Sequence, residues 1–215
     1  MLSHEETRAF HDRFGTKQDR LRIYEDRAVT DLVEHLDPGS AHSVFEFGCG
    51  TGRLAEQLLQ THLTSGARYL GVDASSTMVG LARKRLLRFR TRVEIRLTSS
   101  EISIDAPSGS FDRFLSTYVL DLLTKEDIQL LLGQAHRVLF QSGLLGLVCL
   151  TYGFTLLSTI VERLWSATYR TSPSLLGGCR PLRLREFVKD GWQILYLRKI
   201  ARFGVPSEVL VTKKT

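Results

Sequence analysis

Cysteine is scarce in this sequence, and the three present, Cys49, Cys149 and Cys179, lie far apart in the chain. Because their number is odd and no Cys-x-x-Cys pair occurs, the pattern argues against a disulfide framework. No histidine lies beside a cysteine at the spacing of zinc ligands, so we expect no metal site. Free thiols suit a reducing compartment, and we therefore expect a cytoplasmic protein.

Proline is also rare, with 5 residues in 215, and no low-complexity segment occurs. Hydrophobic residues make up 43% and charged residues 24% of the chain, which is typical of a folded globular protein. Residues 1–15 carry several charges and no apolar run, so we do not expect a signal peptide. The formal net charge of +6 would attract anionic partners, but it does not identify one.

Long hydrophobic runs are few, and the longest uncharged stretch is residues 143–161. Its length approaches the roughly 20 residues of a membrane-spanning helix. However, it contains several hydroxyl side chains and a Tyr152-Gly153 pair. We interpret it as a buried strand, a turn and the beginning of a helix.

Hydrophobic periodicity predicts alternating strands and helices, which is typical of an α/β sheet with right-handed crossovers. Ser75 and Thr124 are the expected N-caps of two of the helices, and Thr124 forms a capping box with Asp127. The last two apolar runs have no helix between them and predict an antiparallel hairpin. The expected strands are residues 43–47, 67–75, 92–98, 111–119, 144–150, 192–200 and 207–213.

The stretch SVFEFGCGTGRLAEQLL, residues 43–59, passes from a strand to a helix through three alternate glycines, Gly48, Gly50 and Gly52. Glycines at such a junction let a ligand approach the backbone, and the helix N-terminus offers N–H groups. Asp73 ends the next expected strand, where an acceptor for ribose hydroxyls is expected. The combination favours a ligand that carries a ribose.

Three ligands compete for this pattern. A phosphate-binding P-loop requires Gly-Lys-Ser/Thr, but Gly52 is followed by Arg53 and Leu54, which excludes it. A dinucleotide fold prefers the spacing G-x-G-x-x-G over the G-x-G-x-G found here, so NAD takes second place. S-adenosylmethionine, which has a ribose but no phosphate, is the remaining candidate.

Four stretches resemble the successive motifs of class I S-adenosylmethionine-dependent methyltransferases: VFEFGCGTG, YLGVDASSTMV, SGSFDRFLSTYVLDLL and AHRVLFQSGLLGL. The similarity spans roughly residues 40–151 and lies within the looser group that includes ubiquinone and menaquinone biosynthesis methyltransferases. It implies a Rossmann-like three-layer sandwich, whose seven-stranded, mostly parallel sheet has an antiparallel last strand, with an N-terminal helical lid. It also implies S-adenosyl-L-methionine as cofactor, S-adenosyl-L-homocysteine as product, and a small-molecule or lipid-like methyl acceptor.

The resemblance also assigns cofactor-binding roles. Glu46 matches the acid that organises the methionine end, and Asp73 matches the acceptor for the ribose hydroxyls. Relatives commonly show Gly-Asp-Ala-Glu after the third strand, whereas this chain has Thr98-Ser99-Ser100-Glu101, so adenine recognition would use Ser100, Glu101 or the backbone. Tyr24 lies where N-terminal helices of the group close over the cofactor. The expected cofactor-binding residues are Tyr24, Glu46, Gly48, Cys49, Gly50, Gly52, Asp73, Ala74, Met78, Ser100, Glu101 and Thr117; for Tyr24 and Met78, core packing is an equally good interpretation.

Methyl transfer from a sulfonium is an in-line displacement, to which alignment and the exclusion of water contribute most. A hydroxyl or ammonium acceptor also needs a base near the methyl group. The family places its substrate beyond the fourth and fifth strands, where Tyr118, Asp121 and Tyr152 lie. Tyr118 and Asp121 are therefore the catalytic candidates, although a helix cap or loop acid is the simpler interpretation of Asp121.

One structural domain is expected, with an N-terminal helical cap at residues 1–40 and a Rossmann-like methyltransferase domain at residues 41–215. Residues 153–184 have no strict match in the family and would form a substrate-side insertion. This segment carries a stripe of mostly apolar residues, and our first interpretation is that the stripe packs in the core. The alternatives are a dimer contact or the entrance of a pocket for an apolar substrate. The stripe consists of Phe154, Leu157, Val161, Leu164, Trp165 and Thr168.

The basic run ARKRLLRFRTR, residues 82–92, suggests nucleic acid as a partner, but we interpret it as a solvated helix face. The fourth strand also lacks the Pro-Pro-aromatic tetrapeptide of methyltransferases that act on base amino groups. The leading hypothesis is a methyltransferase that acts on O, N or C of a small or lipid-like acceptor. A catalytically silent cofactor-binding protein is its rival and a nucleic-acid methyltransferase is disfavoured; peripheral membrane contact and the oligomeric state are left open.

Overall fold

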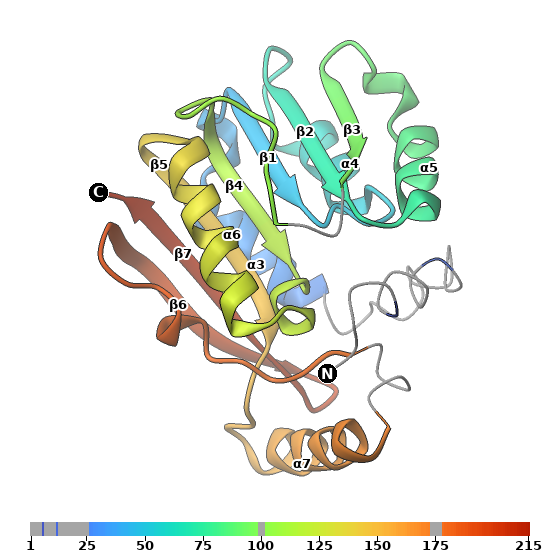
Figure 1. The fold of residues 1–215 in the computed structure, drawn as a ribbon, viewed down its shortest axis with the longest axis vertical. Coiled ribbons are helices and arrows are strands. Elements are labelled where there is room, and N and C mark those ends of the chain that lie inside the picture. The colour runs from blue at the N-terminus through green and yellow to red at the C-terminus, as the bar shows by residue number, and fades with distance from the viewer. Residues whose placement is uncertain (1–5, 7–11, 13–25, 99–101, 173–177) are drawn as a thin grey trace.

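A computed structural model describes residues 6, 12, 26–98, 102–172 and 178–215 of the chain. Seven strands form one sheet in the order β3-β2-β1-β4-β5-β7-β6 (Figure 1). Strands β1 to β5 pair in parallel, while β7 is antiparallel to both β5 and β6. The expected mostly parallel sheet and terminal hairpin are confirmed. The strands are β1 (Ser43–Phe47), β2 (Arg68–Asp73), β3 (Val93–Leu97), β4 (Phe111–Thr117), β5 (Leu139–Leu150), β6 (Trp192–Arg202) and β7 (Val205–Lys214).

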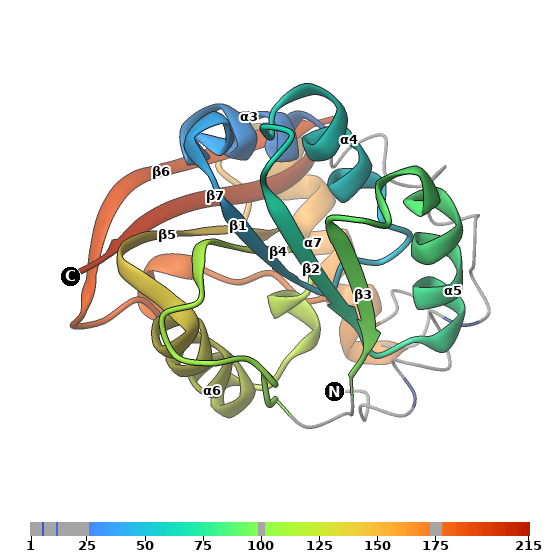
Figure 2. The ribbon, with the colours of Figure 1, turned by 90° about the horizontal axis from the view of Figure 1, so that it is seen from above.

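Helices cover both faces of the sheet, which makes a three-layer sandwich (Figure 2). On one face, α3, α4 and α5 pack on Val44, Leu115 and Val148 of the strands. On the other face, α6 packs on Phe45 and Phe114, the residues that alternate with the first set. The strands are therefore apolar on both sides, as buried parallel strands require. These helices are α3 (Asp26–Leu36), α4 (Arg53–Thr61), α5 (Ser76–Arg85) and α6 (Lys125–Val138).

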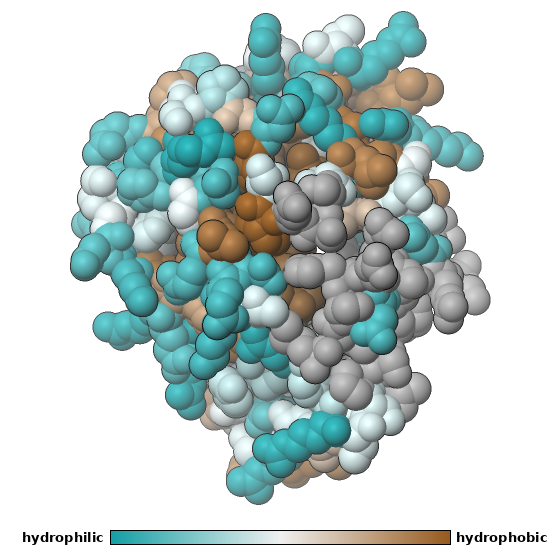
Figure 3. Space-filling model, in the orientation of Figure 1, coloured by the Kyte–Doolittle hydropathy of each residue, from teal (hydrophilic) through white to brown (hydrophobic). Residues whose placement is uncertain are grey.

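Figure 3 shows mostly hydrophilic side chains on the face of the molecule that carries α6, with hydrophobic side chains visible beside this helix.

The structure confirms the expected helix caps of α5 and α6. The Oγ of Ser75 accepts a hydrogen bond from the Met78 N–H at 3.2 Å. The Oγ1 of Thr124 accepts one from the Asp127 N–H at 3.0 Å. Each bond satisfies a backbone donor that the first helical turn leaves without a partner in the helix.

The uncharged stretch divides as expected, because β5 ends at Leu150 and α7 (Leu156–Thr171) begins after a short turn. A capping box between Thr155 and Ser158 starts α7. Among the described residues, no helix is long and apolar enough to cross a membrane.

The expectation that the α7 stripe packs in the core is wrong for Phe154, Leu157 and Leu164, which are exposed. Val161 and Trp165 are half-buried. The physical reason is the position of α7, which lies beyond the end of β5 and contacts the sheet mainly through β7 (Figure 1). Only a narrow strip of the helix surface is covered there.

The basic run proves to be more than a solvated face. Arg83 donates to the carbonyl oxygen of Ile95 at 2.8 and 3.1 Å. Arg85 donates to the carbonyl and hydroxyl oxygens of Thr51 at 3.0 and 2.7 Å. Arg92 donates to the carbonyl oxygen of Leu59 at 2.9 Å. Three of these arginines therefore tie neighbouring elements together, which weakens the case for a nucleic-acid surface.

The structure describes little of the predicted N-terminal cap. Of residues 1–25 it places only Glu6 and Asp12. Within the expected helical cap, α3 is described from Asp26 to Leu36, and it packs on β5 and β7 through a buried face that includes Leu32 and Leu36. The division of the chain at residue 40 stays a prediction.

Candidate cofactor and active site

The parallel strands run in the same direction, so the predicted site residues at their ends lie at one edge of the sheet. Strands β1, β2 and β4 all run toward the end of the molecule where α7 lies (Figure 1). Ligands of open α/β sheets bind at this carboxyl edge, where the loops after the strands meet. The glycine turn follows β1, Asp73 ends β2, and Thr117 ends β4.

All three glycines of the turn have positive φ, with values of +77° at Gly48, +53° at Gly50 and +75° at Gly52. L-residues with a Cβ rarely adopt this conformation. Space is also restricted at two of them. A Cβ on Gly48 would lie 2.3 Å from Cγ2 of Val119, and a Cβ on Gly52 would lie 3.1 Å from Cβ of Ala82. The need for glycine inferred from the sequence therefore has both a conformational and a packing cause.

The N–H groups of the turn are used by the protein itself. Gly48 and Cys49 both donate to the carbonyl oxygen of Val72, at 2.8 and 3.0 Å, and Gly52 donates to that of Cys49 at 3.0 Å. The N–H of Gly50 donates to Oδ2 of Asp73 at 2.8 Å. These four groups stabilise the turn, and the expectation that the N-terminus of the following helix offers N–H groups to a ligand stays a prediction.

Asp73 is oriented by the chain on either side of it. Its Oδ2 accepts from Gly50, and its Oδ1 accepts from the N–H of Ser75 at 2.9 Å. A carboxylate has about four lone-pair positions, so it can accept further hydrogen bonds beside these two. The structure thus joins Asp73 to the glycine turn, a contact that the sequence did not predict, and the geometry suits a carboxylate that accepts from ribose hydroxyls.

Asp12 is a residue that the sequence reasoning missed at this site. Its carboxylate accepts a hydrogen bond from the hydroxyl of Ser75 and lies 3.5 Å from the N–H of Thr77. It therefore sits at the N-terminus of α5, where the helix dipole favours negative charge. No pattern in the sequence around residue 12 pairs it with Ser75, so no signal could have identified it.

Glu46 lies beneath the glycine turn, almost completely buried, and accepts a hydrogen bond from the hydroxyl of Tyr69. Burial raises the pKa of Tyr69, and the charge of Glu46 raises it further. Burial also raises the pKa of the Cys49 thiol, with smaller contributions from Glu46 and Asp73. Cys49 is thus held as a neutral thiol. The role of Glu46 at the methionine end stays a prediction, since its observed partner is Tyr69.

Tyr69 could have been inferred from the strand register. Val44 pairs with Tyr69 and Glu46 with Gly71, so the four residues share one face of the sheet. Gly71 has no side chain, and a Cβ there would lie 3.0 Å from Cβ of Cys49. The empty position lets Tyr69 reach along the face to Glu46.

The remaining predicted residues are placed as follows. Met78 is buried in the interior, Ala74 is half-buried, and Thr117 is buried at the end of β4. Tyr24, Ser100 and Glu101 lie outside the described residues. For Met78 the burial is compatible with either packing on adenine or packing in the core.

The catalytic candidates Tyr118 and Asp121 follow β4, and the structure turns both side chains inward. Tyr118 has a φ of +56°, and its hydroxyl lies 2.8 Å from Oγ of Ser207. Asp121 lies in a short 3-10 helix, Leu120–Leu122, and is fully buried. Its charge helps to raise the pKa of the Cys149 thiol, for which burial is the main cause. Both side chains are buried in the structure, and their roles toward an acceptor stay a prediction.

The groups at the glycine turn fit S-adenosylmethionine. Glu46 and Asp73 place two carboxylates near Cys49 of the turn, and Asp12 adds a third at the beginning of α5, in a chain whose net charge is +6. Negative charge suits a ligand with a positive sulfonium centre. The turn also allows close approach of a ligand without offering the phosphate cradle that a dinucleotide requires.

Comparison with known proteins agrees with this fit. Residues 44–143 match the family described as a methyltransferase domain. An uncharacterized methyltransferase of Oceanobacillus iheyensis is 30% identical over 119 residues, which are 55% of this chain and 50% of that protein. The chain spans about half the length of the curated relatives it matches.

Solved structures share the fold. A SAM-dependent methyltransferase from Methanosarcina mazei has a TM-score of 0.64 and 17% identity, over 85% of this chain and 96% of that one. Geranyl diphosphate methyltransferase in complex with GPP and sinefungin has a TM-score of 0.66 and 13% identity, over 89% and 78% of the two chains. The family match covers residues 44–143, slightly less than half of the chain, and the solved structures share its fold, so the core of this chain is similar to class I S-adenosylmethionine-dependent methyltransferase domains.

Proposed function

We propose that the chain transfers a methyl group from S-adenosylmethionine to O, N or C of a small-molecule or lipid-like acceptor. The observation that carries the proposal is the carboxylate of Asp73, held by the N–H groups of Gly50 and Ser75 at 2.8 and 2.9 Å beside a turn of three positive-φ glycines. Binding of a nucleoside without phosphates requires a fixed acceptor for the ribose hydroxyls. It also requires a backbone that the ligand can approach closely, next to this acceptor.

In this proposal the protein contributes mainly alignment. S-adenosylmethionine, when bound, supplies the activated methyl group. Asp73 would orient the ribose, Glu46 and the glycine turn would orient the methionine end, and Met78 and Ala74 would line the adenine side. Tyr118 and Asp121 would orient the acceptor or take a proton from it. Methyl transfer from sulfonium gains most from such positioning and from exclusion of water, so few reacting side chains are needed.

A small hollow with apolar walls bears on the kind of acceptor. It lies between α7 and the sheet, next to the carboxyl end of β5, and its volume of about 10 Å³ holds about one water molecule, so its walls and not its size carry the argument. Leu150, Val161, Trp165 and Val205 are among the residues that line it. The indole N–H of Trp165 donates to the carbonyl oxygen of Cys179 at 3.0 Å, which fixes the ring. A largely preformed apolar wall suits a hydrocarbon-rich substrate better than a charged one. A solved structure of this fold, geranyl diphosphate methyltransferase in complex with GPP, supports by analogy an acceptor with a hydrocarbon part, although GPP also carries a charged diphosphate.

Calorimetric titration with S-adenosylhomocysteine tests the donor site. We expect wild type to bind and Asp73→Ala to bind about 10- to 150-fold more weakly, the loss of a hydrogen bond to a charged group. Asp105→Ala is the matched control, because Asp105 is exposed and its carboxylate has only a 3.8 Å contact with Arg96. Absence of binding to wild type would refute the cofactor, whereas equal binding of Asp73→Ala would refute the role of Asp73.

A catalytically silent cofactor-binding protein is the second candidate, and the burial of Tyr118 and Asp121 favours it. Labelled-methyl transfer into a cell extract separates the two. Incorporation that depends on Asp73 supports the enzyme, and cofactor binding without incorporation supports the silent protein. Binding of RNA or DNA with steep salt dependence would indicate a nucleic-acid acceptor instead.

A further inference from the structure

The outer face of α7 exposes large aliphatic side chains to water. Leu156 is 89% and Leu164 is 65% exposed, and Leu157 and Ile160 are also more than half exposed. Leu156, Ile160 and Leu164 are spaced four residues apart and Leu157 lies three residues before Ile160, so the four side chains lie on one side of the helix. Isolated exposed leucines are ordinary, but a contiguous group marks a surface that contacts something.

The tip of the β6–β7 hairpin extends this surface. A Cβ on Gly204 would lie 2.7 Å from Cγ2 of Val161 and 3.1 Å from Cγ of Leu157, so the tip packs directly on α7. The preceding residue, Phe203, has a φ of +51° and is 72% exposed. Turn positions with positive φ normally hold glycine or asparagine, so a phenylalanine there is unusual. Leu156, Leu157, Ile160, Leu164 and Phe203 are called the apolar face below.

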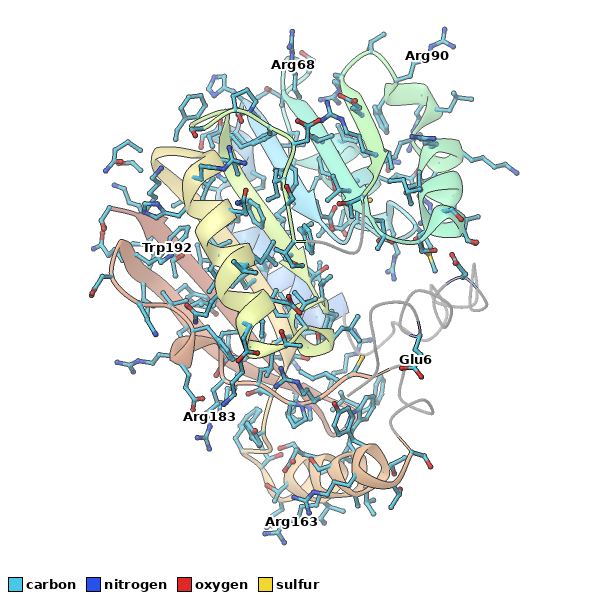
Figure 4. All side chains as sticks on the ribbon, in the orientation of Figure 1. Glu6, Arg68, Arg90, Arg163, Arg183 and Trp192 are labelled. Atoms are coloured by element: carbon cyan, nitrogen blue, oxygen red, sulfur yellow. The ribbon has the colours of Figure 1, made fainter. Side chains whose placement is uncertain are left out.

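Basic side chains surround the apolar face. Arg163 and Arg170 are exposed on α7 itself. The guanidinium of Arg202 lies 5.3 Å from the centre of the Phe203 ring, and that of Arg183 lies 4.9 Å from the Tyr152 ring. In Figure 4, Arg163 and Arg183 both lie at the α7 end of the molecule, with Arg163 on the side of α7 away from the sheet.

Among the described residues, the acids near this surface do not cancel its charge. Glu162, the acid of α7, is half-buried and accepts a hydrogen bond from the hydroxyl of Ser166 at 2.7 Å. Glu186 pairs with Arg183 at 3.3 Å. Arg163, Arg170 and Arg202 remain as positive groups around exposed hydrocarbon. This is the composition of a helix that lies in the plane of a membrane interface.

We propose that the apolar face docks the protein on the surface of an anionic lipid bilayer. Its aliphatic side chains and Phe203 would enter the boundary between headgroups and acyl chains, and the arginines would contact lipid phosphates. A second copy of the chain fits less well. A two-fold contact would place the same arginines of both copies against each other, where like charges repel.

The face lies at the carboxyl edge of the sheet, as the candidate site does (Figure 1). Docking would therefore bring the site next to the bilayer, from which a lipid-like acceptor could enter. This last point rests on the proposed function, whereas docking itself does not. Vesicle binding is measured without donor or acceptor, so a failure of methyl transfer would leave its result unchanged.

The test is co-sedimentation of the full chain with vesicles of phosphatidylcholine containing about one third phosphatidylserine, compared with phosphatidylcholine alone. We expect binding to the anionic vesicles that weakens with salt. Leu156→Glu with Leu164→Glu should weaken it more than about tenfold, and Arg163→Glu with Arg170→Glu at least about tenfold. All four side chains are exposed, so the variants should fold, which circular dichroism checks.

Matched controls come from elsewhere on the surface. Leu130 is an exposed leucine of α6, and Arg90 is an exposed arginine that Figure 4 shows at the opposite end of the molecule from Arg163. Leu130→Glu and Arg90→Glu should bind vesicles like wild type. The proposal is overturned if wild type does not bind anionic vesicles, or if the controls weaken binding as much as the α7 variants. It is also overturned if light scattering shows a dimer that Leu156→Glu with Leu164→Glu abolishes while vesicle binding is unchanged.

Discussion

Replacing Gly48 by alanine should destabilise the protein through two separable effects. The backbone at Gly48 has a φ of +77°, and holding alanine there costs about 1–2 kcal/mol. The new Cβ would also lie 2.3 Å from Cγ2 of Val119, and relieving such a clash in a packed region costs about 1–3 kcal/mol. We therefore expect the free energy of unfolding to fall by about 2–5 kcal/mol, a large part of the roughly 5–15 kcal/mol of a typical domain.

The two effects can be measured by a double-mutant cycle in urea. Val119→Ala removes the methyl group that the new Cβ would meet. The double variant Gly48→Ala, Val119→Ala should therefore recover the packing part, about 1–3 kcal/mol, and retain the conformational part. Titration with S-adenosylhomocysteine of the same variants shows whether the turn keeps its binding geometry.

Gly80→Ala is the matched control for this experiment. Gly80 lies within α5, and a Cβ there would meet nothing within 4 Å. Alanine should therefore stabilise the helix by about 0.5–1 kcal/mol. The reasoning is refuted if Gly48→Ala leaves the free energy of unfolding unchanged, or if the cycle shows no coupling between the two positions.

Two further substitutions test the fold around the site. Ser75→Ala removes the oxygen that accepts a hydrogen bond from the Met78 N–H and should lower the free energy of unfolding, measured in urea, by about 1 kcal/mol. The control Ser76→Ala, one residue further along, should change this free energy little. Equal effects of the two substitutions would contradict the capping role of Ser75. Burial raises the pKa of Glu208 in the folded protein above its unfolded value of about 4.3. Between these two pKa values the native state binds more protons than the unfolded state. The free energy of unfolding therefore falls as the pH rises through this range. Glu208→Gln keeps an acceptor for the Leu184 N–H and should remove this fall in urea titrations from about pH 4 to 8; an unchanged pH profile would show that another group titrates.

Local patterns in the sequence were sufficient for most of the fold. Short apolar runs located the strands, and the hydroxyl caps Ser75 and Thr124 located the beginnings of α5 and α6. Strand β5 was expected from residue 144 but begins at Leu139, immediately after α6. Strand β5 is longer because it pairs with β4 across a register shift, with Phe111 opposite Leu139 and Arg113 opposite Leu144. Such a shift depends on the neighbouring strand, which periodicity along one segment does not describe.

The site was predicted where one short segment carries the chemistry, as in the glycine turn with Asp73. It was missed where two distant segments share a task. Tyr69 reaches Glu46 only because of the strand register, and Asp12 reaches Ser75 from a segment 63 residues earlier. The exposure of Leu157 and Leu164 was also missed, because an amphipathic stripe has the same spacing whether a sheet covers it or not.

The internal hydrogen bonds of the glycine turn have a consequence for how the site responds to its ligand. The N–H groups of Gly48, Cys49, Gly50 and Gly52 already have protein acceptors, so their amide hydrogens should exchange slowly with solvent in the free protein. Cofactor binding would then change exchange mostly outside the turn. A turn that is ordered on folding loses little conformational entropy on binding, so donor affinity can be tuned by the surrounding side chains while the turn itself stays rigid.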